Sequence, residues 1–231
     1  MDDPLVVRDR YETPDGLVTL YLGDALDRNE WLAADFLITD PPYGIGGGLS
    51  FNGRQGGPLF RQQQWDGDLG VRDAVLERWG YDRPYAIFGS PRRLDAAPPF
   101  RATPLVWDKG NVPAMGDTKF PWRPTWEIIY VNGQGWTGFR GESVLRHDHS
   151  TRAAKLAGHP TPKPVSLMED LISKTPEGSV IADPFAGSGS TLIAARNLGR
   201  KAIGVEISEE YFLACVRRLE SFQQRQEGSG A

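Results

Sequence analysis

Short apolar runs recur along the chain and alternate with segments whose apolar residues follow helical spacing. The runs have the length and the β-branched and aromatic content of strands, and they lie at residues 17–22, 36–40, 85–89, 105–107, 126–131, 180–183 and 202–206. Several are apolar almost throughout, which is typical of strands buried on both faces of a parallel sheet.

Three helices are predicted in the second half of the chain. The first follows Pro164, which suits a first helical position, and its apolar residues recur at helical spacing. The second follows Gly189 and ends at Gly199. The third begins after Ser208, whose hydroxyl can cap it. Alternating strands and helices predict a doubly wound α/β sheet in one domain over residues 1–226.

Two long segments and the tail do not follow this alternation. Residues 44–67 are rich in Gly and Gln and too long for an ordinary connection, so we expect a mobile functional loop there. Residues 131–158 are polar and basic and show no clear periodicity. The tail, residues 227–231, is expected to be disordered.

Composition narrows the class of protein. The 231 residues include one cysteine, Cys215, which excludes an internal disulfide and fits a reducing cytoplasm. The apolar helical pattern around Cys215 predicts a small core residue. No apolar run approaches the roughly 20 residues of a membrane span, and the acidic N-terminus lacks the pattern of a secretory signal. We therefore expect a cytoplasmic protein without a membrane partner.

The net charge of −4 counts against a nucleic-acid binder unless basic residues are concentrated locally. Residues 140–163 hold a local excess of three positive charges, and residues 44–64 hold two arginines and no acid. The candidate contacts to nucleic acid are Arg54, Arg61, Arg140, Arg146 and Arg152. A solvated surface loop is the alternative in both segments.

The segment LITDPPYGIGGG, residues 37–48, places Asp40 at the end of a predicted buried strand. Pro41 and Pro42 fix φ and stiffen the turn, and Tyr43 follows directly. In open α/β sheets, ligands bind beyond the carboxyl ends of the strands. The corner therefore suits a site that holds a carboxylate, a backbone carbonyl and a ring in fixed geometry. A turn that only stops the strand is the alternative.

A second segment, VIADPFAGSGSTLIAARNLGRKAIGVEIS at residues 180–208, reads as strand, glycine-rich turn, helix and strand. Glycines let the backbone approach a ligand closely where the strand meets its helix. Glu206 lies 23 residues after Asp183, a spacing that suits hydrogen bonds to ribose hydroxyls. The turn is not GxGxxG, so it favours a nucleoside without phosphates. A purely structural βαβ unit is the alternative.

Together, DPPY and DPFAGSG resemble the S-adenosylmethionine-dependent amino-methyltransferases that modify adenine N6 or cytosine N4 of DNA. DPPY comes first and DPFAGSG follows about 140 residues later, with GHPTPKPVSLMEDLI at 158–172 just before it. This circularly permuted order, with the catalytic half before the cofactor half, looks like the β group of that family. The resemblance covers residues 17–219 and implies a Rossmann-like methyltransferase fold in a prokaryotic or phage-encoded enzyme.

The resemblance assigns roles by position. Asp40, Pro41, Pro42 and Tyr43 would form the catalytic corner. S-adenosylmethionine would be held by Asp24, Ala25, His159, Thr161, Lys163, Asp183, Phe185, Ala186, Gly187, Ser188, Gly189 and Glu206. Within that set, Glu206 would take the ribose hydroxyls, Asp24 would lie near the adenine, and Lys163 would meet the methionine carboxylate.

The resemblance also implies a mechanism. Asp40 and the Pro41 carbonyl would accept hydrogen bonds from the target amine and aim its lone pair at the methyl sulfonium. Tyr43 would stack on a base flipped out of double-stranded DNA. Asp at the first position of the motif favours adenine over cytosine. A homodimer is left open, and no metal is expected, because His147 and His149 lack further ligands nearby in the sequence.

The chain departs from the family in its target-recognition segment, which is at most residues 131–158. So short a segment offers few side chains for reading base edges, so we expect relaxed or very short sequence specificity or a second subunit. Loop 44–67 is expected to close over the substrate. The alternatives are cytosine-N4 methylation, methylation of RNA or of a glutamine side chain, and a non-catalytic DNA-binding subunit. A stand-alone modification enzyme and the partner of a restriction nuclease give the same pattern.

Overall fold

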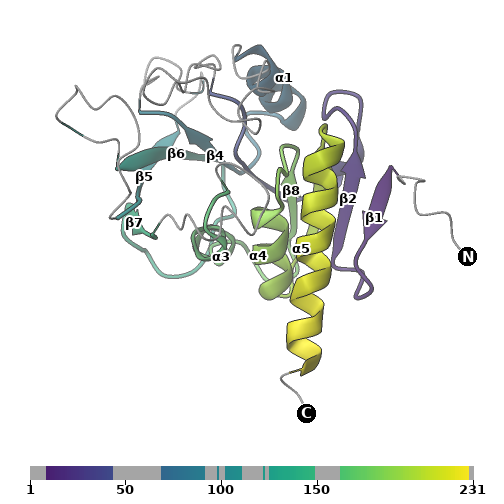
Figure 1. Cartoon of the computed structure of the whole chain (residues 1–231). Helices are drawn as coiled ribbons and strands as arrows, with labels where there is room; N and C mark the ends of the chain where they lie inside the picture. Colours follow the sequence, from purple (N-terminus) through teal and green to yellow (C-terminus); the bar gives the residue numbers. More distant parts are fainter. Residues whose placement is uncertain are drawn as a thin grey trace, which may run out of the picture.

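The computed structural model describes residues 9–43, 69–91, 98, 102–110, 122, 125–148 and 162–228, with side chains described as far as residue 221 (Figure 1). Loop 44–67, predicted to be mobile, lies outside these residues. Among the described residues, no helix has both the length and the apolar character needed to cross a membrane.

The described strands form one sheet in the order β1-β2-β9-β8-β3-β4-β6-β5-β7. Their bounds are β1 Arg10–Glu12, β2 Val18–Leu22, β3 Phe36–Thr39, β4 Tyr85–Gly89, β5 Thr103–Asp108, β6 Trp126–Asn132, β7 Val144–Arg146, β8 Val180–Asp183 and β9 Lys201–Glu206. The central strands β2, β9, β8, β3 and β4 are parallel to one another. Their carboxyl ends therefore meet at one edge of the sheet, which we call the carboxyl edge, and the opposite edge is the amino edge.

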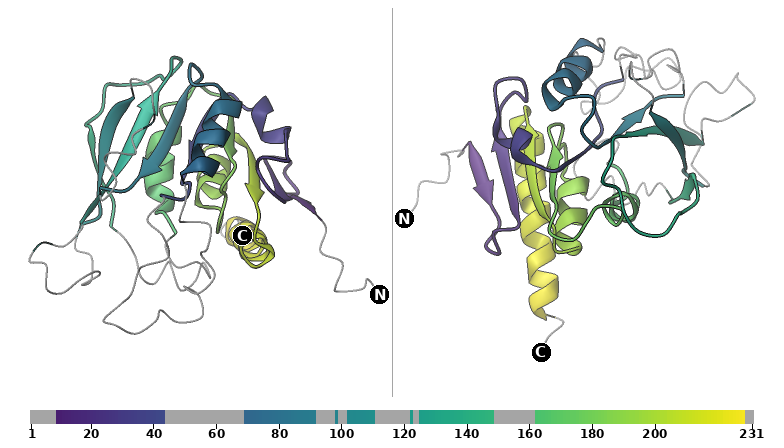
Figure 2. Two further views of the ribbon diagram at one scale, coloured as in Figure 1. Left: turned by 90° about the horizontal axis from the view of Figure 1, so that it is seen from above. Right: turned by 180° about the vertical axis from the view of Figure 1, so that it is seen from behind.

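Helices cover both faces of this sheet. Their bounds are η1 Glu30–Ala33 (a 3-10 helix), α1 Gly70–Trp79, α3 Val165–Ile172, α4 Ser190–Asn197 and α5 Glu209–Gly228. The buried apolar side chains form two hydrophobic cores, one on each face of the sheet. The first core lies between the sheet and helices α3, α4 and α5, and the second lies between the sheet and helices η1 and α1. Helix α5 lies beside β2 in Figure 1 and in the right-hand view of Figure 2, in agreement with its contacts to that strand.

Strand β3 shows why the apolar runs are continuous. Phe36 and Ile38 belong to the core beneath α3 and α4, whereas Leu37 between them belongs to the core beneath η1 and α1. All three side chains are buried. Because successive residues of a strand point to opposite faces, a strand covered on both sides must be apolar at every position. Cys215 is also fully buried in the first core, as its helical pattern predicts.

The predicted α/β fold is confirmed, and each of the predicted strands and helices is present. Four elements were not predicted: the edge strands β1 and β7, of three residues each, the 3-10 helix η1, and helix α1. The expectation of a parallel sheet holds for the five central strands and for the pair β5 and β7. In contrast, β1 pairs antiparallel with β2, and β6 pairs antiparallel with both β4 and β5. Helix α5 extends to Gly228, two residues into the tail that was expected to be disordered.

The reversed direction of β6 decides where its two ends lie. Ile128 pairs with Gly89 at the carboxyl end of β4, so the beginning of β6, including Glu127, lies at the carboxyl edge. Asn132 pairs with Tyr85, so the residues after β6 turn round the amino edge before β7 returns along β5. Residues 131–148 of the expected recognition segment are therefore partly strands of the sheet, although the sequence shows no clear periodicity there.

Candidate active site

The predicted corner, Asp40 to Tyr43, follows β3 directly at the carboxyl edge. Tyr43 Oη donates a hydrogen bond to Asp40 Oδ1 over 2.5 Å, and Lys163 Nζ donates to Asp40 Oδ2 over 2.5 Å. The stiff Pro41-Pro42 turn brings the phenol back onto the carboxylate three residues earlier. Each carboxylate oxygen keeps a further lone pair, so Asp40 can still accept a hydrogen bond from a substrate.

Glu127, at the beginning of β6, contacts this corner from the neighbouring part of the sheet. Its Oε2 accepts a hydrogen bond from Lys163 Nζ over 3.2 Å and lies 3.2 Å from Tyr43 Oη, whose one proton is shared between Asp40 and Glu127. Its Oε1 accepts from Lys109 Nζ over 2.6 Å. Lys109 follows β5 and Lys163 precedes α3, so segments far apart in the sequence supply one cluster of two carboxylates, two ammonium groups and a phenol. We call these five residues the charge cluster.

The charge cluster is shielded from water. The side chains of Lys163, Glu127 and Lys109 are 6%, 14% and 15% exposed, whereas that of Asp40 is 26% exposed. Lys163 Nζ also lies 5.0 Å from the centre of the Phe88 ring and 5.5 Å from that of Tyr43. Aromatic faces and carboxylates both favour an ammonium group at this place. Asp40 is thus the most accessible of the four charged groups.

The neighbouring charges set the protonation states of the charge cluster. Burial raises the pKa of Asp40 and outweighs the opposing effect of Lys163. Burial would also raise the pKa of Glu127, but Lys163 and Lys109 together lower it. The two carboxylates likewise raise the pKa of Lys163 against the effect of burial. Burial, Asp40 and Glu127 raise the pKa of Tyr43 well above its usual value, so its hydroxyl keeps the proton that it donates.

The glycine-rich turn follows β8, the strand next to β3. Gly189 has φ +81°, and a Cβ atom at this position would lie 2.3 Å from Cys215 Sγ. Glycine is therefore required both by backbone conformation and by the close approach of α5. Arg218 of α5 donates hydrogen bonds to the Ser188 carbonyl and to Ser188 Oγ, which fixes the turn from behind.

Asp183 and Glu206 are the buried carboxyl groups of this region. Asp183 Oδ1 accepts a hydrogen bond from Thr39 Oγ1 over 2.6 Å, and burial raises the pKa of Asp183 to about 6. Glu206 accepts from the backbone N–H groups of Gly187 over 2.7 Å and of Ser208 over 2.8 Å. Burial raises the pKa of Glu206 to about 7, and these two hydrogen bonds oppose the shift.

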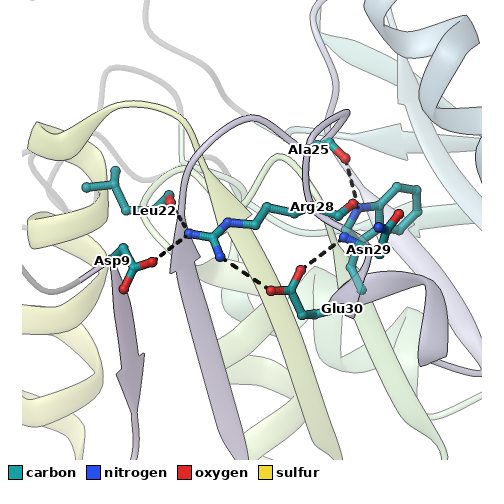
Figure 3. Close-up of polar contacts among 7 residues, drawn as sticks. Asp9, Leu22, Ala25, Arg28, Asn29 and Glu30 are labelled. Carbon is teal, nitrogen blue, oxygen red and sulfur yellow. Dashed lines mark hydrogen bonds and ion pairs between the residues drawn. The ribbon is translucent and has the colours of Figure 1, made fainter.

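The turn after β2 brings the predicted Asp24 and Ala25 next to β9, because the Gly23 N–H donates to the Glu206 carbonyl over 2.9 Å. Arg28 holds this turn in shape (Figure 3): it donates to the Leu22 carbonyl and pairs with Asp9 and with Glu30. The indole of Trp31 donates to the Ala25 and Arg28 carbonyls, each over 3.0 Å. Asp24 Oδ1 accepts from the Leu26 N–H over 2.8 Å, which is typical of a carboxylate that shapes its own turn.

The structure therefore gathers two sets of predicted residues at the carboxyl edge: the corner on β3, and the turns after β2, β8 and β9. Lys163, predicted to meet the cofactor carboxylate, lies against Asp40 and Glu127. Its predicted role stays untested. His159, Thr161, Arg54, Arg61 and Arg152 lie outside the described residues.

The two described arginines of the predicted DNA contacts lie at opposite edges of the sheet. Arg146 ends β7 opposite Asp108, at the carboxyl edge, and pairs with Glu142 over 2.9 Å. Arg140 belongs to the turn round the amino edge, next to Phe139, whose carbonyl accepts a hydrogen bond from Lys174. Arg140 is therefore not on the side of the sheet that carries Asp40.

His147 contacts α3 through both of its ring nitrogens. Nδ1 lies 2.9 Å from Ser166 Oγ and Nε2 lies 2.7 Å from Asp170 Oδ2. Within the described ranges, no group of three or more His, Cys, Asp or Glu side chains is placed to hold a metal ion. The contacts of His147 give it a structural role, because they tie the end of β7 to α3.

Known proteins resemble this chain in sequence. The profile of the N6/N4 family described as "DNA methylase" matches residues 106–217. The putative methylase YubD of Escherichia coli (strain K12) is 30% identical over 210 residues, which cover 86% of this chain and 87% of that protein. The chain belongs to the N6/N4 DNA methylase family.

Other proteins resemble this DNA methylase in sequence over a shorter stretch, or in the fold of their solved structures. The type II methyltransferase M2.DpnII of Streptococcus pneumoniae is 46% identical over 88 residues, which cover 37% of this chain and 30% of that protein. The crystal structure of M1.HpyAVI with SAM superimposes with a TM-score of 0.61 at 23% identity, covering 87% of this chain and 98% of that chain. At that identity the likeness shows a shared fold, and it confirms the predicted Rossmann-like methyltransferase architecture.

Sequence reasoning on this DNA methylase missed Glu127 and the supporting arginines Arg28 and Arg218. Glu127 is an acidic residue at the start of an apolar strand, WEIIYV. A charged residue at the end of a strand is common, so the sequence gives no sign of a functional role. Its place in the site follows only from the reversed direction of β6. Lys109 ends the segment LVWDK at residues 105–109, and nothing in the sequence links it to the catalytic corner.

Proposed function

We propose that this DNA methylase transfers the methyl group of S-adenosylmethionine to N6 of an adenine flipped out of double-stranded DNA. The observation that carries the proposal is the placement of Asp40 and the glycine-rich turn on the adjacent parallel strands β3 and β8. A carboxylate at the end of one strand thus opens onto the same crevice as a nucleoside-binding turn at the end of the next.

The turns after β2, β8 and β9 fit the cofactor. The Glu206 carboxylate at the end of β9 uses one lone pair of each oxygen on a backbone N–H, so lone pairs remain for ribose hydroxyls. Gly187 and Gly189 have positive φ angles, which glycine adopts readily. Because glycine has no side chain, the backbone of the turn stays open to a ligand at these two positions. Asp24 and Ala25 lie on the other side of Glu206. When bound, S-adenosylmethionine supplies an electrophilic methyl group on a sulfonium.

The catalytic corner prepares the nucleophile. The exocyclic amine of adenine is a weak nucleophile because its lone pair is delocalised into the ring. Asp40 and the Pro41 carbonyl each accept a hydrogen bond from the amine, so the nitrogen becomes more tetrahedral and its lone pair turns toward the methyl group. Positioning and electrostatics supply most of the rate gain in such a site. The proton leaves after methylation, when the nitrogen is acidic, and Asp40 is the acceptor within reach.

Tyr43 takes part through both its ring and its hydroxyl. The hydroxyl is held by Asp40 and Glu127, so the ring has a fixed orientation beside the corner. A ring fixed in this way is a stacking surface for a base that has left the duplex. The Tyr43 side chain is half-buried.

We propose that DNA binds along the carboxyl edge of the sheet. Arg146 is 66% exposed there and can reach a phosphate. Since residues 131–143 reach the amino edge and 144–146 form β7, the recognition segment that can reach DNA beside Asp40 is shorter than 131–158. This supports relaxed or very short sequence specificity, because few side chains remain to read base edges. Arg54, Arg61 and Arg152 remain predicted phosphate contacts.

The choice of adenine follows from Asp at the first position of the motif. Among the relatives, the DNA adenine methyltransferase YhdJ of Escherichia coli (strain K12) is 44% identical over 63 residues, which cover 27% of this chain and 21% of that protein. The cytosine-N4-specific PvuII DNA methyltransferase shares the fold, with a TM-score of 0.59 at 18% identity over 86% of this chain and 85% of that chain. We propose adenine, and the identity of the methylated nucleoside tests this choice.

The proposal is tested with purified protein, S-adenosylmethionine carrying a labelled methyl group, and unmethylated DNA or RNA as acceptor. We expect label in double-stranded DNA and none in RNA. Label in RNA alone would overturn the DNA assignment. Cofactor binding without transfer to either acceptor would instead favour a non-catalytic subunit.

A further inference from the structure

Glu127 contacts both buried lysines of the charge cluster, and one of them, Lys163, also contacts the catalytic carboxylate of Asp40. It contacts Tyr43, Lys163 and Lys109 but makes no hydrogen bond to Asp40 among the contacts of the described residues. Its own side chain is 14% exposed, so its contacts form away from bulk water. Glu127 thus touches the groups that hold Asp40.

We propose that Glu127 is a positioning residue for methyl transfer: its carboxylate holds Lys163 and Tyr43 in the places from which they orient Asp40. The inference rests on the proposed function, because it assigns Glu127 a role in the same reaction. It adds a residue from β6 to a site whose recognised motifs lie after β3 and in the segment before α3.

The first argument concerns charge. Lys163 and Lys109 bring two positive charges to the site, and Asp40 alone would leave an excess of one. Glu127 brings the cluster to neutrality, and it binds Lys109 at 2.6 Å, so that Lys163 is the one ammonium group of the cluster that Asp40 binds. Without Glu127, both ammonium groups would compete with the substrate amine for the lone pairs of Asp40. Buried ion pairs are costly unless each charge is compensated.

The second argument concerns geometry. Glu127 Oε2 accepts from Lys163 and lies 3.2 Å from Tyr43 Oη, and Lys163 Nζ also lies 3.1 Å from Tyr43 Oη. Lys163 and Tyr43 are the groups bonded to the two oxygens of Asp40. Glu127 therefore fixes both contacts at once. A small displacement of a catalytic carboxylate can reduce a rate about 100-fold, because the aligned geometry is lost.

A role through charge has a directional consequence for pH dependence. The charged and titratable groups that act on Asp40 are Lys163, Glu127 and Tyr43, together with Asp183 on the adjacent strand β8, and Lys109 lies behind Glu127. The negative charge of Glu127 raises the pKa of Asp40. Replacing Glu127 with Gln removes that charge, so the acidic limb of the rate profile, where Asp40 loses its proton, should move to lower pH. A residue that only stabilised the fold would leave the limb in place.

The experiment compares the wild type with Glu127→Gln, Glu127→Asp and the control Glu177→Gln, which removes the same charge from an exposed turn at the amino edge. Steady-state methylation of DNA gives kcat and KM from pH 5 to 9, and calorimetry gives the Kd of S-adenosylmethionine. For Glu127→Gln we expect kcat to fall about 10- to 100-fold, with KM for DNA and the cofactor Kd nearly unchanged and the acidic limb displaced to lower pH. Glu127→Asp should recover part of kcat and the position of the limb.

Unchanged kcat in Glu127→Gln would overturn the inference while the proposed function stood. Glu127→Gln could instead lose its folded structure and its affinity for the cofactor along with kcat, with no recovery in Glu127→Asp. That result would show that Glu127 only stabilises the fold, and it would also overturn the inference. A wild-type protein that methylates no nucleic acid would refute the proposed function itself. The wild-type measurement therefore separates the two failures.

Discussion

Thr39 Oγ1 donates a hydrogen bond to Asp183 Oδ1 over 2.6 Å, and this contact joins the two motifs of the site. Thr39 is the residue before Asp40, and Asp183 begins DPFAGSG. The bond lies between adjacent parallel strands, in the buried interior of the sheet. It fixes the distance between the catalytic corner and the cofactor turn, which in-line transfer between two bound molecules requires.

Replacing Thr39 with Val should destabilise the protein by about 1–3 kcal/mol at pH 8, because the buried Asp183 carboxylate loses a donor. The pKa of Asp183 is raised to about 6, so the carboxyl group is protonated at pH 5 and the loss should be smaller there. Urea unfolding at the two pH values measures both. The control is Thr137→Val, since Thr137 is exposed and its hydroxyl contacts the Lys174 carbonyl. An equal loss at pH 5 and pH 8 would show that Asp183 charge is not involved.

The free energy of unfolding of the protein without cofactor should fall as pH rises from about 5 to 8. Burial raises the pKa of Glu206 from 4.5 to about 7, so the folded protein keeps a proton that the unfolded chain has already lost. The stabilisation is therefore complete below the unfolded pKa and is lost as pH rises through 7. Glu206 can contribute at most about 3 kcal/mol to this change.

Urea unfolding across this range, with Glu206→Gln beside the wild type, tests the assignment. The variant should show a flatter dependence on pH, because it has no carboxyl group to ionise at this position. Parallel curves for the two proteins would place the titrating group elsewhere.

Gly189→Ala should destabilise the protein more than Gly178→Ala. Both glycines have nearly the same φ, +81° and +79°, so the backbone strain is matched at about 1 kcal/mol. A Cβ atom at Gly178 would meet nothing within 4 Å, whereas one at Gly189 would lie 2.3 Å from Cys215 Sγ. Overpacking of a core costs about 1–3 kcal/mol more.

The double variant Gly189→Ala, Cys215→Ala identifies the cause. It removes the sulfur that the new methyl group would strike, so part of the stability lost in Gly189→Ala should return. Thermal unfolding of the single and double variants gives the coupling. Additive losses would mean that the contact with Cys215 is not what excludes a side chain at Gly189.

Arg146→Ala and Arg140→Ala should differ in their effect on DNA binding. Arg146 lies at the carboxyl edge with Asp40, and Arg140 lies in the turn round the amino edge. Loss of one phosphate contact should weaken binding and reduce the slope of log K against log salt by about 1. We expect this for Arg146 and no change for Arg140, in fluorescence anisotropy with labelled duplex DNA. Equal effects of the two variants would contradict the placement of the DNA along the carboxyl edge.

The fold could be predicted from sequence because its core strands obey a strong local rule. Phe36, Leu37 and Ile38 are buried on alternating faces, so β3 is apolar at every position and reads as a central strand. Strand β7 has three residues at the sheet edge, and neither length nor pattern marks it. Helix α1 was missed because charged residues interrupt its apolar positions.

The residues of the candidate site likewise fall into those that a local sequence pattern could place and those that only the folded chain brings together. Asp40, the glycine-rich turn and Glu206 lie at strand ends within short motifs, so their place at the carboxyl edge follows from a parallel sheet. Glu127 could not be placed from sequence, because its position depends on β6 running antiparallel to β4. The contact between Lys163 and Asp40 spans 123 residues and depends on the path of the chain before α3.

The central claim is methyl transfer to adenine N6 of DNA by a site centred on Asp40. The most direct measurement is mass spectrometry of nucleosides from DNA treated with labelled S-adenosylmethionine and either wild-type protein or Asp40→Ala. The account predicts labelled N6-methyldeoxyadenosine with the wild type and its loss in Asp40→Ala, which should still bind the cofactor. Labelled N4-methyldeoxycytidine would contradict the choice of base, and equal labelling by Asp40→Ala would contradict the site.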